Sequence, residues 1–190
     1  MRRVVDTNVA VTANGDATNQ CVTACGRALL AVANGGHLFV DAAGDIVAEY
    51  RKNLAAHGDP RAGNAFFKWL LTNEWNPQKV TRVAITKKAD DKDSFNELPD
   101  PPEGVRYDPS DRKFLAVSAA HPEHPPVLQA LDSKWWGWKD ALQQSGVIIH
   151  FLCPDDIARK HEEKTRRFHE HAWKRSREDS VTAHRRAGPR

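Results

Sequence analysis

The sequence predicts an α/β fold with a mainly parallel sheet. Short apolar runs alternate with amphipathic segments over most of the chain, as expected when strands are joined by crossover helices. The first run is short and ends abruptly, which is typical of a strand buried on both faces. We predict strands over residues 4–5, 37–41, 80–86, 127–131 and 147–152, of which 80–86 alternates like an edge strand.

The helices are predicted from spacing and from end signals. Residues 18–33 place apolar side chains at helical spacing, and the sequence Asn34-Gly35-Gly36 that follows is typical of a helix end. Asp45 is a candidate N-cap for a helix over 46–56. Further helices are predicted over 62–72, 111–120, 135–144 and 155–178, whereas 87–105 is charged, rich in Pro and predicted to be a loop.

The chain has 190 residues, a length that suits one domain better than two. Its charge is distributed unevenly. The net charge is +3, but residues 156–190 hold eleven Lys and Arg against six Asp and Glu, which leaves 17 against 19 elsewhere. We therefore expect a domain over 1–155 and a basic helical tail over 156–190 with a disordered end. Such tails often contact nucleic acid or an acidic partner, although a solvated helix is the commoner case.

The three cysteines, Cys21, Cys25 and Cys153, are an odd number without framework spacing, which argues against a secreted disulfide scaffold. We expect Cys21 and Cys25 to be small buried residues on one helix. Zinc binding is a minor alternative, because the remaining ligands are not evident. No apolar run approaches the roughly 20 residues that span a bilayer. A cytoplasmic protein without membrane attachment is therefore expected.

Acidic residues occur where the predicted fold would gather them. Asp6 and Asp132 each follow a predicted strand, and Asp111 begins a predicted helix. In such folds the carboxyl ends of the strands and the starts of the helices share one edge, where ligands bind. Carboxylates suit Mg²⁺ or Mn²⁺. Such ions activate water and neutralise phosphate charge during phosphodiester cleavage.

Five segments resemble the motifs of PIN domains, in order and in spacing, over residues 1–155. They are residues 4–9 (VVDTNV), 45–50 (DIVAEY), 111–119 (DRKFLAVSA), 128–133 (LQALDS) and 146–154 (GVIIHFLCP). The resemblance implies a three-layer, Rossmann-like fold and a metal-dependent nuclease, most often an endoribonuclease. It also implies an RNA substrate and, for the many small relatives that are toxins, an antitoxin protein as partner. PIN proteins are often homodimers.

By this resemblance the metal ligands and catalytic residues are Asp6, Glu49 and Asp111, with Asp132 completing the site. Thr7 and Asn8 would orient Asp6 or its waters. The chain departs from the family pattern twice. A lysine, Lys134, stands where a second acid usually follows the fourth motif, and the insertion-like region 58–105 is longer than in small PIN toxins.

Each acid also has an ordinary structural explanation. Asp6 could begin a turn, Glu49 could be solvated on its helix, and Asp132 could be an N-cap. Asp111 fits the third position of a capping box that begins at Asp108.

Four basic residues next to the acids are candidates for binding substrate phosphates: Arg51, Arg112, Lys113 and Lys134. The leading hypothesis is an RNA endonuclease. The alternatives are a toxin of a toxin–antitoxin pair with the same chemistry and a catalytically inactive PIN fold that binds nucleic acid or protein.

Overall fold

The computed structural model describes residues 1–58 and 60–186, and these form an α/β fold around one five-stranded sheet. Every neighbouring pair of strands is parallel, and the order is β3-β2-β1-β4-β5. The prediction of a mainly parallel sheet is confirmed. The strands are β1 (Arg2–Val5), β2 (His37–Asp41), β3 (Val80–Val83), β4 (Val127–Gln129) and β5 (Ile149–Phe151).

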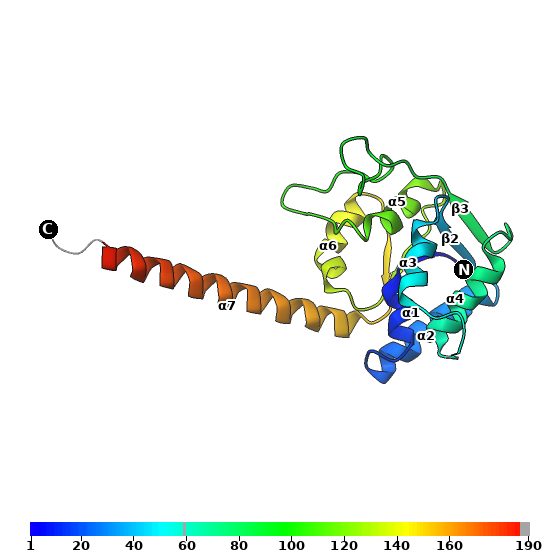
Figure 1. The fold of residues 1–190 in the computed structure, drawn as a ribbon, viewed down its shortest axis with the longest axis horizontal. Coiled ribbons are helices and arrows are strands. Elements are labelled where there is room, and N and C mark those ends of the chain that lie inside the picture. The colour runs from blue at the N-terminus through cyan, green and yellow to red at the C-terminus, as the bar shows by residue number, and fades with distance from the viewer. Residues whose placement is uncertain (59, 187–190) are drawn as a thin grey trace.

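Helices lie between the strands and pack in groups (Figure 1). They are α1 (Thr7–Ala13), α2 (Asn19–Ala33), α3 (Asp45–Asn53), α4 (Ala62–Asn73), α5 (Arg112–Ala120), α6 (Ser133–Gln144) and α7 (Pro154–Arg186). Helices α1, α2 and α4 pack on one another, while α5 packs on β1, β2 and β4. This arrangement is compatible with a Rossmann-like fold of three layers.

The central strands are buried, as the apolar runs predicted. Val4 and Val5 of β1 and Leu38 of β2 are fully buried. A strand with both faces covered needs helices on either side of the sheet. The core therefore encloses β1 and β2, and this fixes the points at which the chain leaves them.

Helix α1 was not predicted. It begins directly after Asp6, where the sequence TNVAVTA is rich in β-branched residues that disfavour helix. Five of its seven residues are buried, so packing against α2 and α4 outweighs local propensity.

The predicted cap of α3 is wrong. Gly44 is the residue before the helix, and Asp45 is already helical. The buried Asp41 takes the capping role from the end of β2. Its carboxylate accepts the Asp45 N–H at 2.8 Å and the Ile46 N–H at 2.7 Å. The helix ends at Asn53, three residues before its predicted end.

Part of region 58–105 belongs to the body of the fold. Helix α4 packs against α1 and α2, and Gly63 approaches α1 so closely that a Cβ would lie 1.9 Å from the Ala10 carbonyl oxygen. Strand β3 forms the sheet edge and ends at Val83, before the predicted end at 86. The loop that follows contains one bridge between Lys87 and Phe95.

The tail is a single helix that leads away from the body (Figure 1). It was predicted to end near 178, but α7 continues to Arg186. The predicted disordered end, beyond 186, lies outside the described residues. Near its start, His161 Nδ1 lies 3.0 Å from the Ser133 carbonyl oxygen, which fixes α7 against α6. Among the helices described, none is both long and apolar enough to cross a membrane.

The cysteines differ from the expectation in one respect. All three are buried, but Cys21 and Cys153 form a disulfide across a sequence separation of 132 residues. Cys21 lies in the first turn of α2 and Cys153 directly before α7. The fold brings these two helix starts together, with a Cα–Cα distance of 5.4 Å. Spacing along the sequence carries no trace of this contact.

Candidate functional site

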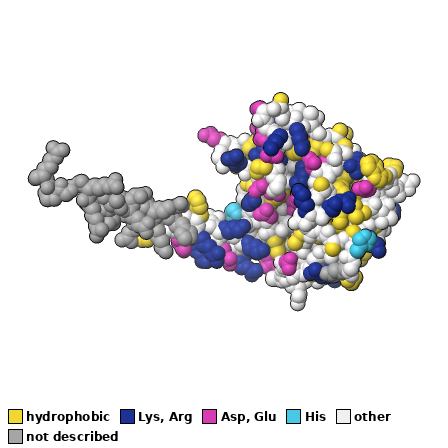
Figure 2. Space-filling model, viewed as in Figure 1, with side chains coloured by type: hydrophobic (Ala, Val, Ile, Leu, Met, Phe, Trp, Pro, Cys, Tyr) yellow, Lys and Arg dark blue, Asp and Glu magenta, His cyan; other side chains and the backbone are white. Residues whose placement is uncertain are grey.

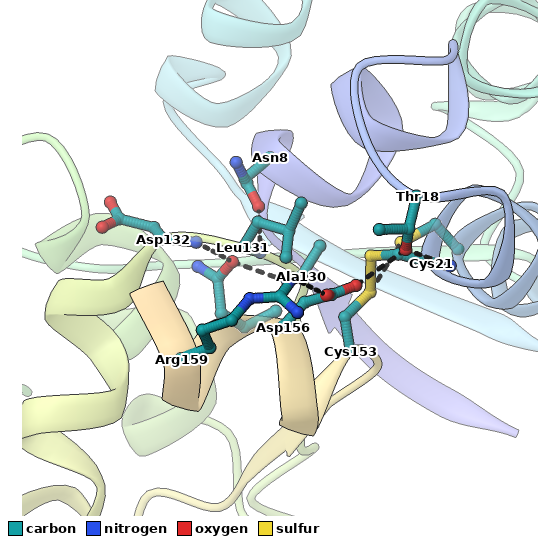
Figure 3. The surroundings of a disulfide bond; sticks show 11 residues. Asn8, Thr18, Cys21, Ala130, Leu131, Asp132, Cys153, Asp156 and Arg159 are labelled. Atoms are coloured by element: carbon teal, nitrogen blue, oxygen red, sulfur yellow. Dashed lines mark hydrogen bonds and ion pairs between the residues drawn. A yellow bond between two sulfur atoms is a disulfide. The ribbon is translucent and has the colours of Figure 1, made fainter. Parts of the chain in front are cut away.

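The predicted acids lie where the strand order of the sheet reverses. From β1 the chain continues to β2 and β3 on one side, and it later returns to β4 and β5 on the other. Crevices form at such a switch point, beyond the carboxyl ends of the strands. Asp6 directly follows β1, and Asp132 follows β4 by three residues. Asn8 joins the two loops, because its side-chain oxygen accepts the Leu131 N–H at 2.7 Å (Figure 3).

Asp6 is a buried carboxyl group that is costly to ionise. It is the N-cap of α1 and accepts the Asn8 N–H at 2.8 Å, while only 4% of its surface is exposed. Burial raises the pKa of Asp6 well above its usual range, and the charge of Asp111 raises it further. Among the described residues, no Lys, Arg or His forms an ion pair with it.

Asp111 is the second buried acid. It directly precedes α5, and its side chain makes no capping hydrogen bond. The capping box that would begin at Asp108 is therefore not formed. Its carboxylate accepts the indole N–H of Trp135 at 3.1 Å instead. Burial, followed by the charges of Asp132 and Asp108, raises the pKa of Asp111 to about 7, although Lys134 opposes the shift. Ionising both Asp6 and Asp111 is therefore unfavourable without a compensating positive charge.

Asp132 and Glu49 are more accessible than these two acids. Asp132 is half-buried and caps α6 by accepting the Lys134 N–H at 3.1 Å, so its structural explanation holds. Glu49, also half-buried on α3, forms an ion pair with Lys113. Both carboxylates nevertheless interact electrostatically with Asp6, because each raises the pKa of that carboxyl group.

The four acids have the oxygen donors that a divalent cation prefers, but in this structure they are too far apart to share one. No three of them bring ligand oxygens within 4.8 Å of one another in the described part of the chain. Each carboxylate faces another partner: a backbone N–H, an indole or Lys113. The donors are nonetheless all oxygen, as Mg²⁺ prefers. The Thr7 hydroxyl beside them is buried without a hydrogen-bond partner.

The predicted phosphate-binding residues are mostly engaged with acids of the chain itself. Lys134 pairs with Asp108 and lowers the pKa of that carboxyl group to about 2. Arg112 pairs with Asp91 at 2.8 Å. Lys113 pairs with Glu49. Arg51 lies exposed on α3.

A groove beside Glu49 gathers further positive charge. Its volume is about 460 Å³, and Figure 2 shows Lys and Arg beside Asp and Glu over this part of the body. The basic residues lining it are Lys52, Lys87, Lys92 and Lys113. Lys87 and Lys92 were not predicted, because they belong to the loop after β3 and no motif marks them.

Two aromatic residues support the acids. Trp135 is fully buried, and nothing in the sequence indicates its hydrogen bond to Asp111. Tyr50 donates a hydrogen bond to the Val5 carbonyl, which ties α3 to the end of β1.

Comparison of the chain with protein-family models, with curated proteins and with solved structures finds no match. The likeness to PIN domains therefore depends on the five segments and on where the fold places them. The fold and the site define an α/β protein with acidic residues gathered near the switch point of a parallel sheet.

Proposed function

We propose that this chain is a metal-dependent endonuclease of the PIN type that cleaves RNA and requires Mg²⁺ or Mn²⁺. The observation that carries the proposal is the pair Asp6 and Asp111. These carboxyl groups come from distant parts of the sequence, are both buried, and have raised pKa values. Acids with strongly shifted pKa values are more typical of functional sites than of structural ones.

A cation bound here would activate water and neutralise charge on the phosphate. Asp6 and Asp111 are the residues to hold it. Glu49 joins them once it separates from Lys113, and the freed lysine then faces the groove, where it can contact a phosphate oxygen. A lysine bound to the phosphate in this way would offset the repulsion between the substrate and the acids.

Two neighbouring residues would keep this geometry. Asn8 holds the loop after β1 against the loop after β4, which fixes the direction of Asp6. Trp135 holds one oxygen of Asp111 and leaves the other for a cation. Asp132 would complete the site or position water, in agreement with its half-buried place at the start of α6.

The test is cleavage of a labelled RNA, and of DNA of the same sequence, with Mg²⁺ or Mn²⁺. The Asp6→Asn variant should lose activity by at least about a hundredfold, because a ligand at the reacting centre is removed. Asp140→Asn is the matched control, since this acid is exposed on α6. Equal cleavage by wild type and Asp6→Asn would overturn the assignment, and cleavage of DNA alone would overturn the choice of RNA.

A second candidate function is RNA or protein binding without catalysis. The ion pair between Glu49 and Lys113 favours it, because it keeps a proposed ligand away from the other acids. Thermal unfolding with Mn²⁺ separates the two functions. A rise in Tm that Asp6→Asn abolishes supports the nuclease, whereas an unchanged Tm supports the binding module.

A further inference from the structure

The three cysteines form one buried cluster, on a part of the molecule that the proposed nuclease chemistry does not use. Their sulfur atoms all lie within 4.8 Å of one another. Cys21 and Cys25 are one turn apart on α2, and Cys153 comes from the segment between β5 and α7. Cys25 is the free thiol, with its sulfur 3.9 Å from that of Cys153.

We propose that the reduced chain binds one Zn²⁺ ion through the thiolates of Cys21, Cys25 and Cys153. Two sulfurs bound to one tetrahedral zinc, each at about 2.3 Å, are about 3.8 Å apart. The distance between Cys25 and Cys153 already matches this separation. Small sulfur movements within the cluster complete the site without a change of fold. Thiolate sulfur also selects zinc over Mg²⁺ and Mn²⁺, so the cluster and the acidic site would hold different ions.

The helix starts favour thiolates at Cys21 and Cys153, whereas burial raises the pKa of the Cys25 thiol to about 12, so zinc itself must displace that proton. Cys21 lies in the first turn of α2, a helix of 15 residues, and its N–H bonds to the capping hydroxyl of Thr18 at 3.3 Å. Cys153 directly precedes α7, and its carbonyl oxygen accepts the Ile157 N–H at 3.0 Å. The positive end of a helix dipole stabilises a neighbouring anion. Two of the three sulfurs therefore lie at helix starts.

The fourth coordination position would face a hollow of about 390 Å³ that Cys21 and Cys153 help to line. Asp156 borders the same hollow and accepts a hydrogen bond from Thr18 at 2.7 Å (Figure 3). Arg159 pairs with Asp156 and adds positive charge beside the thiolates. Water or the Asp156 carboxylate can thus complete a tetrahedral site, and the hollow gives the ion a path inward.

The disulfide and the zinc site exclude each other, because both use the sulfurs of Cys21 and Cys153. A dithiol such as dithiothreitol opens the disulfide. Two electrons and two protons pass to the sulfurs, and the dithiol becomes a cyclic disulfide. Zinc then displaces the three thiol protons as it binds. The cluster would therefore exist as an oxidised, metal-free form and a reduced form that binds zinc.

The test uses Co²⁺ as a probe on full-length protein that has been reduced and freed of reductant without oxygen. Cobalt should produce an intense sulfur-to-metal charge-transfer band in the near ultraviolet, and stoichiometric zinc should abolish it. Protein with the disulfide intact should show no band. The acidic site contains no sulfur, so Asp6→Asn should leave the band unchanged.

The matched variant is Cys25→Ser, which leaves both partners of the disulfide in place. It should still form the disulfide, but its zinc affinity in the reduced state should fall by at least about tenfold. Zinc-edge X-ray absorption of reduced wild type provides a measurement without any variant, with three sulfur neighbours expected at about 2.3 Å. A shell of oxygen and nitrogen alone, or unchanged zinc affinity in Cys25→Ser, would overturn the proposal.

Discussion

Replacing Asp111 by Asn should stabilise the metal-free protein at neutral and alkaline pH. The carboxyl group is buried, and its pKa is raised to about 7 from an ordinary value of 3.8. Asn cannot ionise, yet its amide oxygen can still accept the indole N–H that Trp135 donates. The substitution therefore removes a buried charge without removing its hydrogen bond.

The pH dependence follows from which state binds the proton. Between about pH 4 and pH 7 the folded protein keeps the Asp111 proton that the unfolded chain has lost, so stability falls as pH rises through this range. Above pH 7 the folded state also carries the buried charge. At 1.36 kcal/mol per pKa unit the full effect is about 4 kcal/mol, of which roughly 2–3 kcal/mol falls between pH 5 and pH 8.

Urea unfolding of wild type and Asp111→Asn in the presence of a chelator measures this difference. The stability advantage of the variant should grow from pH 5 to pH 8, because only wild type has the Asp111 carboxyl group to ionise, and relief of the raised pKa of Asp6 acts in the same direction. An advantage that is absent at pH 8, or that does not depend on pH, would refute the reasoning. Saturating Mn²⁺ should reverse the order, since the cation stabilises the carboxylate and not the amide.

Three further changes have defined outcomes. Trp135→Phe removes the indole donor from Asp111, so the acid limb of the pH–activity profile should move to higher pH, as measured by initial rates. Cys21→Ser should lower the free energy of unfolding of the oxidised protein by about 5 kcal/mol, because the disulfide closes a loop over a separation of 132 residues. The urea unfolding curves of the variant and of wild type should coincide once wild type is reduced. Gly63→Ala should lower stability by about 3 kcal/mol, because its Cβ would overlap α1. In calorimetry the control Gly26→Ala should be neutral or better, since its Cβ meets only an ordinary contact at 3.5 Å.

The sheet could be predicted because its strands are encoded locally. The fully buried Val4 and Val5, followed at once by Asp6, mark a strand with both faces covered and a charge at its end. A parallel sheet then places Asp6 and the loop after β4 at the same edge, although the pairing of β1 with β4 is known only from the structure. The positions of Asp6, Asp111 and Asp132 at one edge follow from these patterns.

The contacts that hold the site could not be predicted, because they join distant parts of the chain. Asp41 caps α3 from the end of a strand, and local spacing favoured Asp45 instead. Likewise, Trp135 lies 24 residues from Asp111, and nothing in the sequence indicates their hydrogen bond. Such pairings are set by tertiary packing, which single-sequence patterns do not record.

The cysteine cluster shows the same limit. Cys21 and Cys25 share a helix face, as their spacing predicts, but the third sulfur belongs to Cys153, which lies 128 residues beyond Cys25 in the sequence. Counting cysteines along the chain therefore argued against the disulfide that the fold forms.

The central claim is that one cation gathers the acids at the switch point, and anomalous diffraction from crystals soaked in Mn²⁺ tests it most directly. We expect a peak between Asp6 and Asp111, with Glu49 turned toward it and away from Lys113. A peak elsewhere, or no peak with the Glu49–Lys113 ion pair retained, would contradict the metal-dependent nuclease.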